Sequence, residues 1–178
     1  RLLVNPTDDF SFRRVVNAPK RGIGDKSIEK LALFAEMHSF SLLEAAGSPL
    51  NGISGKAGKG LADFAQLITD LTKMQEFVTL TDLIEEVMNK SGYIASLEQA
   101  RTMEADARID NMREFLSVAK EFEDSRLDTQ AEESPLVQFL TDLSLVTDME
   151  SEEETSASQI TLMTLHAAKG LEFPVVFL

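Results

Sequence analysis

The sequence closes with Thr161-Leu-Met-Thr-Leu-His-Ala-Ala-Lys-Gly-Leu-Glu-Phe-Pro-Val-Val-Phe-Leu178, a pattern that predicts a strand, a tight turn and a second strand. The turn falls in the small residues from Ala167 to Gly170, and the second strand follows Pro174. A strand as apolar as 175–178 belongs in a sheet covered on both faces, yet the preceding sequence supplies almost no other strands. We therefore expect residues 159–178 to be a piece of a larger α/β protein.

The rest of the chain predicts helices, because apolar residues recur at helical spacing behind residues that favour helix starts. Ser41 and Glu44 can form a capping box, and Ser134 precedes a proline at a first helical position. The acidic, serine-rich segment 148–158 lacks periodicity and predicts a mobile loop. Other helices are expected to start near Thr7, Asp25, Thr79 or Thr81, and Thr102. The long helix after the second glycine-rich turn carries the apolar stripe Ala57, Leu61, Phe64, Ile68 and Leu71. The last three predicted helices stop at Ser91-Gly92, near Glu123 and at Leu145. The predicted fold class is mainly α, with a helical body over residues 1–158 and the strand-turn-strand piece after it.

The composition is that of an ordinary globular chain, with 43% hydrophobic and 26% charged residues among 178. No apolar run is long enough to cross a membrane. The absence of cysteine removes disulfides and thiolate metal sites and fits a cytoplasmic protein. Only His38 and His166 offer imidazole, and the carboxylates have the spacing of solvated helix faces, so no metal site and no catalytic residue are expected.

The net charge of −13 argues against nucleic acid as a partner, but the charge is unevenly distributed. Residues 1–60 carry nine Lys and Arg against six Asp and Glu, whereas residues 61–178 carry eight against twenty-four. A basic first third on an acidic body indicates one local anionic partner.

The segment Asn17-Ala-Pro-Lys-Arg-Gly-Ile-Gly24 lies between two expected short helices, which is typical of a helix-hairpin-helix DNA module. Its two glycines are expected to adopt positive φ and let a phosphate approach, while Ile23 anchors the turn in the core. The N–H groups that open the next helix favour an anion, and nothing in the turn reads bases. The residues expected to contact duplex DNA here are Lys20, Arg21, Gly22, Ile23, Gly24, Lys26 and Ser27.

A second turn, Gly52-Ile-Ser-Gly55, precedes the long helix and has a weaker pattern, because Ser54 stands where a regular hairpin has glycine. Lys56 and Lys59 support phosphate binding at this turn, so Gly52, Gly55, Lys56 and Lys59 complete the expected duplex site. The alternative is that both turns only join helices and that the chain is a protein-interaction module. The two hypotheses differ in salt dependence, because phosphate contacts release counterions.

The string Thr164-Leu-His-Ala-Ala-Lys-Gly-Leu-Glu-Phe173 resembles motif V of the superfamily 1A DNA helicases, the PcrA/UvrD/Rep group. The resemblance covers essentially the whole chain. It implies that residues 1–158 are the helical 2B subdomain inserted in the second motor domain, and that residues 159–178 belong to the 2A-type motor domain. It also implies a longer protein that translocates 3′ to 5′ on single-stranded DNA and unwinds duplex DNA using ATP and Mg²⁺. In that protein this subdomain is expected to restrain unwinding in one of its orientations.

The resemblance assigns roles to residues of motif V as well. Thr164 and His166 match residues on the path of single-stranded DNA, whereas Gly170 supports the turn and Glu172 matches a residue that contacts the ribose of the nucleotide. The phosphate-binding loop and the Asp-Glu metal motif are absent from this sequence, so we expect the chain alone to bind no nucleotide and to hydrolyse no ATP. The expected partners are duplex DNA, the rest of the motor and a regulatory protein.

Overall fold

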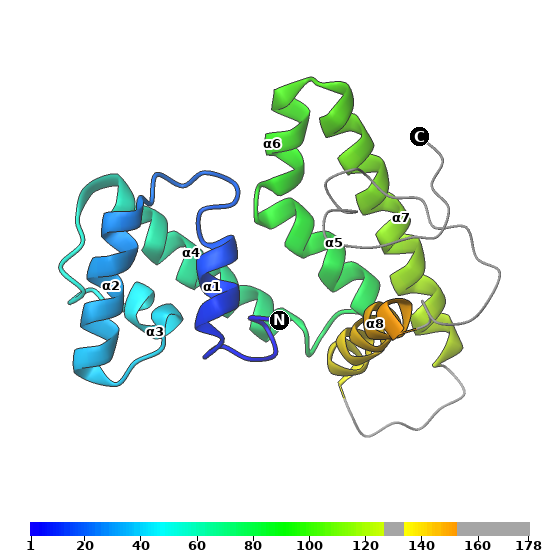
Figure 1. The fold of residues 1–178 in the computed structure, drawn as a ribbon, viewed down its shortest axis with the longest axis horizontal. Helices are drawn as coiled ribbons and strands as arrows, with labels where there is room; N and C mark the ends of the chain where they lie inside the picture. Colours follow the sequence, from blue (N-terminus) through cyan, green and yellow to red (C-terminus); the bar gives the residue numbers. More distant parts are fainter. Residues whose placement is uncertain (127–133, 153–178) are drawn as a thin grey trace, which may run out of the picture. The chain divides into compact units, whose positions relative to one another are not determined.

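The computed structural model describes residues 1–126 and 134–152, with side chains in the second range as far as Leu145. Within these ranges the chain forms helices and no strand, which confirms the mainly α prediction (Figure 1). The strand-turn-strand expected over 159–178 lies outside the described residues. The helices are α1 (Asp9–Val15), α2 (Asp25–His38), α3 (Leu42–Gly47), α4 (Gly55–Met74), α5 (Leu80–Lys90), α6 (Tyr93–Ala100), α7 (Met103–Ser125) and α8 (Pro135–Glu152).

Helices α1 to α4 surround a first apolar core. Leu61, Phe64 and Ile68 of the stripe predicted for α4 belong to this core, whereas Leu71 is buried outside it and Ala57 is half-buried. Phe64 meets the fully buried Phe12 of α1 edge to face, with 5.6 Å between ring centroids. Two aromatic rings in this geometry stabilise the pair beyond the area that they bury. The core residues are Leu2, Phe12, Val16, Ile23, Leu31, Ala35, Leu42, Ala45, Ala46, Leu61, Phe64, Ala65 and Ile68.

Helices α5, α6 and α7 pack together with the first turns of α8 into a second group. Phe139 of α8 lies against Phe115 and Phe122 of α7, at 5.6 and 5.2 Å between ring centroids. The carboxylate of Glu123, near the end of α7, accepts hydrogen bonds from two groups at the start of α5, the Leu80 N–H at 3.0 Å and the Thr81 hydroxyl at 2.8 Å. Both groups belong to one compact unit, residues 1–142 (Figure 1).

Most helix starts follow the cap residues seen in the sequence. The capping box is present, since the Ser41 hydroxyl accepts from the Glu44 N–H at 3.2 Å and the Glu44 carboxylate accepts from the Ser41 N–H at 2.7 Å. Thr79 and Thr102 cap α5 and α7, and α8 begins at Pro135. No helix within the described ranges is long and apolar enough to cross a membrane.

Two helix predictions were wrong in detail. The N-cap of α1 is Asp8 rather than Thr7, because the Asp8 carboxylate accepts from the Ser11 N–H at 2.9 Å while the hydroxyl of Thr7 donates to Asn5. Helix α6 was not expected. Gly92 was interpreted only as a stop, but its φ of +76° turns the chain sharply enough for a new helix to begin at the next residue.

The predicted loop over 148–158 was wrong at its start, because α8 continues to Glu152. The apolar pattern stops at Leu145, which is where the sequence predicts the end of this helix. Backbone helix formation does not need an apolar stripe, so the loss of apolar periodicity does not mark the end of a helix.

Candidate nucleic-acid interface

The first turn, residues 17–24, is held from inside by Asn17. Its side-chain oxygen accepts from the N–H of Arg21 at 2.7 Å and from the N–H of Ile23 at 3.4 Å. Ile23 is buried, with 3% of its surface exposed, and anchors the turn in the core as predicted. An asparagine that accepts from backbone amides further along the chain is a common device in turns.

The two glycines of this turn differ, which corrects the expectation of positive φ at both. Gly22 has a φ of +77°, whereas Gly24 has φ −90° and ψ 167°, which is extended backbone. Gly24 is extended because it is the N-cap residue of α2, a position that favours this conformation. Asp25, the N-cap predicted from the sequence, is the first residue of the helix instead.

The second turn, residues 48–54, repeats this arrangement with another asparagine. The buried Asn51 accepts from the Ile53 N–H at 2.9 Å and donates to the Ala45 carbonyl at 3.0 Å. Gly52 and Gly55 both have a φ of +68°. Neither asparagine was predicted to hold its turn, although in each turn an asparagine precedes the isoleucine by a few residues.

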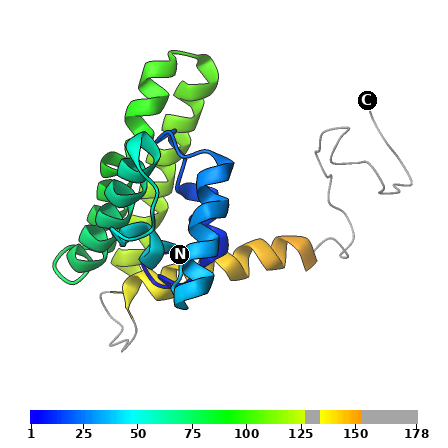
Figure 2. The same cartoon turned by 90° about the vertical axis from the view of Figure 1, so that its left-hand side faces the viewer.

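The two turns lie next to each other although they are far apart in the sequence. A Cβ added at Gly22 would lie 2.8 Å from Cδ and Cε of Lys56, so the aliphatic part of that lysine lies across the first turn. A Cβ added at Gly60 of α4 would lie 2.8 Å from the carbonyl oxygen of Arg21. Lys30 of α2, which the sequence analysis did not assign to the site, donates to the Gly52 carbonyl at 2.5 Å. The starts of α2 and α4 consequently lie at the same end of the first helical group (Figures 1 and 2).

Both helices that follow the turns begin without a side-chain cap. In the described part of the chain, side chains cap α1, α3, α5 and α7, whereas the N-cap residues Gly24 of α2 and Ser54 of α4 make no such hydrogen bond. Helix α6, whose N-cap residue is Gly92, shares this feature. The first N–H groups of a helix have no intrahelical acceptor, so α2 and α4 present unsatisfied donors beside the two turns.

The expected lysines surround these helix starts and are exposed. Lys59 pairs with Asp63 at 2.5 Å, but both side chains are mostly exposed, and such a pair contributes about 0–1 kcal/mol at most. Ser27 is half-buried in the first turn of α2, whose acidic residue is Asp25. The exposed lysines are Lys20, Lys26, Lys56 and Lys59.

Arg21 differs from the lysines, because its guanidinium points into the protein. It donates to four backbone carbonyls, and burial lowers the pKa of this group from its ordinary value.

The residues expected on the single-strand path and at the nucleotide lie outside the described residues; they are Thr164, His166, Gly170 and Glu172. Within the described ranges no cluster of acidic and histidine residues could hold a metal ion.

The described part of the chain is thus a helical domain in which two glycine turns lie together, each followed by a helix without a side-chain cap. The sequence pattern of one family, described as the UvrD-like helicase C-terminal domain, matches residues 1–178, and the chain belongs to this family. The chain is 46% identical over 184 residues to the ATP-dependent DNA helicase PcrA of Bacillus subtilis (strain 168). It is 42% identical over 179 residues to the protein of the same name from Staphylococcus aureus (strain Mu50 / ATCC 700699). Each alignment covers 100% of this chain and 24% of the relative, so the chain spans about a quarter of their length.

Proposed function

We propose that the chain is a regulatory, duplex-DNA-contacting part of an ATP-dependent 3′–5′ DNA helicase of the cytoplasm. In this proposal residues 1–158 are a 2B-type subdomain with two helix-hairpin-helix turns, and residues 159–178 are the strand-turn-strand of motif V in a 2A-type motor domain. The family assignment and the printed name of the relatives support a helicase. The observation that carries the duplex contact is the meeting of two uncapped helix starts and their lysines at one surface.

The proposed contact is with phosphates and not with bases. Free N–H groups at a helix start and the helix dipole both favour an anion, and lysines add attraction that does not depend on sequence. The start of α4 is the more favourable of the two, because its first turn has no acidic residue whereas that of α2 contains Asp25. Phosphate contacts position a protein on the duplex without distinguishing sequences, so binding should be independent of sequence.

Motif V completes the proposal for the longer protein. Thr164 and His166 would lie on the path of single-stranded DNA, and Gly170 and Glu172 would act at the nucleotide. ATP and Mg²⁺ would be bound chiefly by parts of the longer protein that carry the phosphate-binding loop, which this sequence does not contain. The chain alone would then have no ATPase activity and no measurable affinity for nucleotide.

The test measures the affinity of the chain for a fluorescent duplex by anisotropy at several salt concentrations. The double substitution of Lys20 and Lys26 by alanine should weaken duplex binding. It should also reduce the slope of log affinity against log salt by roughly 1 to 2, because two phosphate neutralisations are lost. The matched control replaces Lys73 of α4 and Lys120 of α7, both exposed and outside the two turns. This control changes the net charge equally and should leave the slope unchanged.

A parent chain that does not bind duplex, or two double variants with the same slope, would contradict the proposal. The turns would then be structural connections only, and the protein-interaction module would be the better hypothesis.

A further inference from the structure

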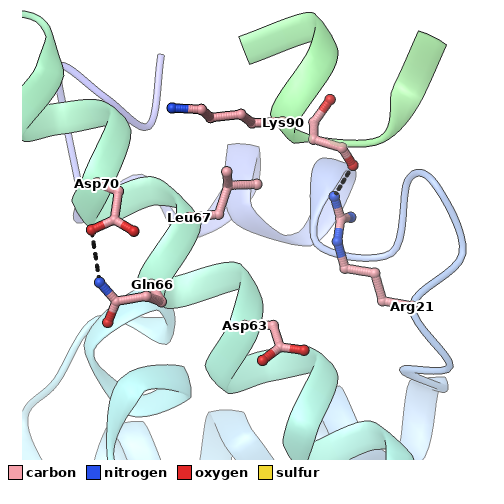
Figure 3. Close-up of a pocket in the computed structure, with 7 residues that line it drawn as sticks. Arg21, Asp63, Gln66, Leu67, Asp70 and Lys90 are labelled. Carbon is pink, nitrogen blue, oxygen red and sulfur yellow. Dashed lines mark hydrogen bonds between the residues drawn. The ribbon is translucent and has the colours of Figure 1, made fainter. Parts of the chain in front are cut away.

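Arg21 lies in the first turn but is bound by atoms inside the protein. Its Nη1 donates to the carbonyls of Val15, Val16 and Pro19 at 3.3, 3.1 and 3.2 Å, and its Nη2 donates to the Ser91 carbonyl at 2.9 Å. The guanidinium also lies over the ring of Phe64 in α4, 5.1 Å from the centroid. Figure 3 shows the side chain reaching from the turn to the end of α5, beside a hollow of about 420 Å³ that residues of α4 also line.

The hydrogen bond from Arg21 to the Ser91 carbonyl joins residues that are 70 positions apart. Ser91 and Gly92 form the corner between α5 and α6, here called the α5–α6 corner, in which Gly92 has a φ of +76°. A second contact supports the same connection, since a Cβ added at Gly92 would lie 3.8 Å from Cγ of Pro19. The first turn is therefore joined to the α5–α6 corner by a hydrogen bond, and Pro19 of the turn lies near Gly92.

The chemistry of Arg21 suits a structural link better than a phosphate contact. Arginine is a planar fork with five N–H donors, so it can bind several carbonyls at once, whereas lysine is a flexible point charge that cannot reproduce this geometry. A guanidinium that leaves these carbonyls for a phosphate would give up four hydrogen bonds and its contact with the Phe64 ring. The acceptors are all backbone oxygens, so the link depends on where the chain runs and not on which side chains stand at those positions.

We propose that Arg21 is a positioning residue that couples the first turn to the α5–α6 corner, so that affinity for duplex DNA depends on the conformation of that corner. The part of the proposal that concerns DNA rests on the proposed function. The coupling itself is a property of the fold. Anything that shifts the corner, whether a substitution or a bound partner, would displace Arg21 and change how the turn presents its amides.

The first arm of the test uses substitutions of Arg21. Arg21→Ala and Arg21→Lys should weaken duplex binding to the same extent, roughly five-fold or more, while the salt slope stays that of the parent chain. If Arg21 were a phosphate contact, lysine would restore binding, and alanine would reduce the slope by about 1. That pattern would overturn the proposal.

The second arm acts on the corner, whose residues are not among those proposed to contact DNA. Gly92→Ala strains the positive φ and should also weaken duplex binding without changing the slope. Combined with Arg21→Ala, it should add little further loss, because both substitutions break one connection. Additive losses in the double variant would contradict the coupling.

A third measurement does not involve DNA, so it separates this proposal from the proposed function. The backbone N–H groups of Arg21 and Ile23, both bound to Asn17, should exchange with solvent faster in Gly92→Ala, as NMR would detect. The control, Thr102→Ala, removes the N-cap of α7, lowers stability by a similar amount and should leave exchange at these two amides unchanged relative to the rest of the core. Unchanged exchange in Gly92→Ala, or equal acceleration in the control, would refute the coupling even if the chain binds no duplex.

Discussion

Replacing Gly22 by alanine should destabilise the chain much more than the same replacement at Gly24, two residues away. Gly22 has a φ of +77°, in the left-handed region where a Cβ costs about 1–2 kcal/mol. The added Cβ would also displace the flexible side chain of Lys56, which can move at little cost, so the backbone accounts for most of the effect. Gly24 has φ −90°, and nothing lies within 4 Å of a Cβ added there. Alanine at Gly24 should therefore cost only the difference between glycine and alanine as N-cap residues, about 0.5 kcal/mol.

Thermal unfolding followed by circular dichroism separates the two variants. For a chain of this size, about 1–2 kcal/mol lowers Tm by roughly 2–8 °C, whereas about 0.5 kcal/mol lowers it by roughly 1–2 °C. The comparison is internally controlled, because both substitutions add one methyl group to the same exposed turn. A loss at Gly24 equal to or larger than the loss at Gly22 would refute the reasoning, since it would mean that the left-handed residue of the folded turn is not Gly22.

Three further outcomes are expected. Gly58→Ala should lower Tm, because the added Cβ would overlap the carbonyl oxygen of Ile53. Alanine is normally favoured over glycine inside a helix by about 1 kcal/mol, so a raised Tm would show that this contact relaxes easily. Glu123→Ala should lower the free energy of unfolding by about 1.5–3 kcal/mol, because it removes a carboxylate that accepts two hydrogen bonds from the start of α5. A urea titration measures this change, and an unchanged midpoint would mean that water replaces the carboxylate. Gly24→Ser should leave Tm unchanged or slightly raised, because serine is a good N-cap residue for α2. It should weaken duplex binding in the anisotropy assay, because the serine hydroxyl would cap the amides proposed to bind phosphate. Tighter binding would argue that those amides are not used.

The parts of this fold that were predictable from sequence are those determined by nearby residues. A capping box such as that of Ser41 and Glu44 forms between residues three apart, and a proline such as Pro135 fixes its own backbone, so these helix starts could be read from short windows. The stripe on α4 was predictable for a similar reason, because residues at helical spacing share one face of a helix, and Leu61, Phe64, Ile68 and Leu71 are all buried.

Features that depend on distant residues were not predictable. The sequence does not reveal which glycine of Gly22-Ile-Gly24 takes positive φ, because the burial of Ile23 and the start of α2 decide it together. Arg21 stands among lysines in the sequence, which does not reveal that its guanidinium donates to backbone carbonyls, one of them in a corner 70 residues further on. The role of Gly92 was missed because one glycine can end a helix or join two, and only the packing of α6 on α7 distinguishes these outcomes.

The division of the apolar residues into two groups has a consequence for the order of folding. The first core is complete once Ile68 of α4 is present, and its contacts join segments that are close in the sequence, which favours fast formation. During synthesis the N-terminal residues emerge first, so this core can form while α5 and α6 are still being made. The hydrogen bond from Arg21 to Ser91 has to wait for the later segment. A nascent chain halted before residue 91 would thus carry a folded first core whose first turn still lacks its hydrogen bond to the α5–α6 corner.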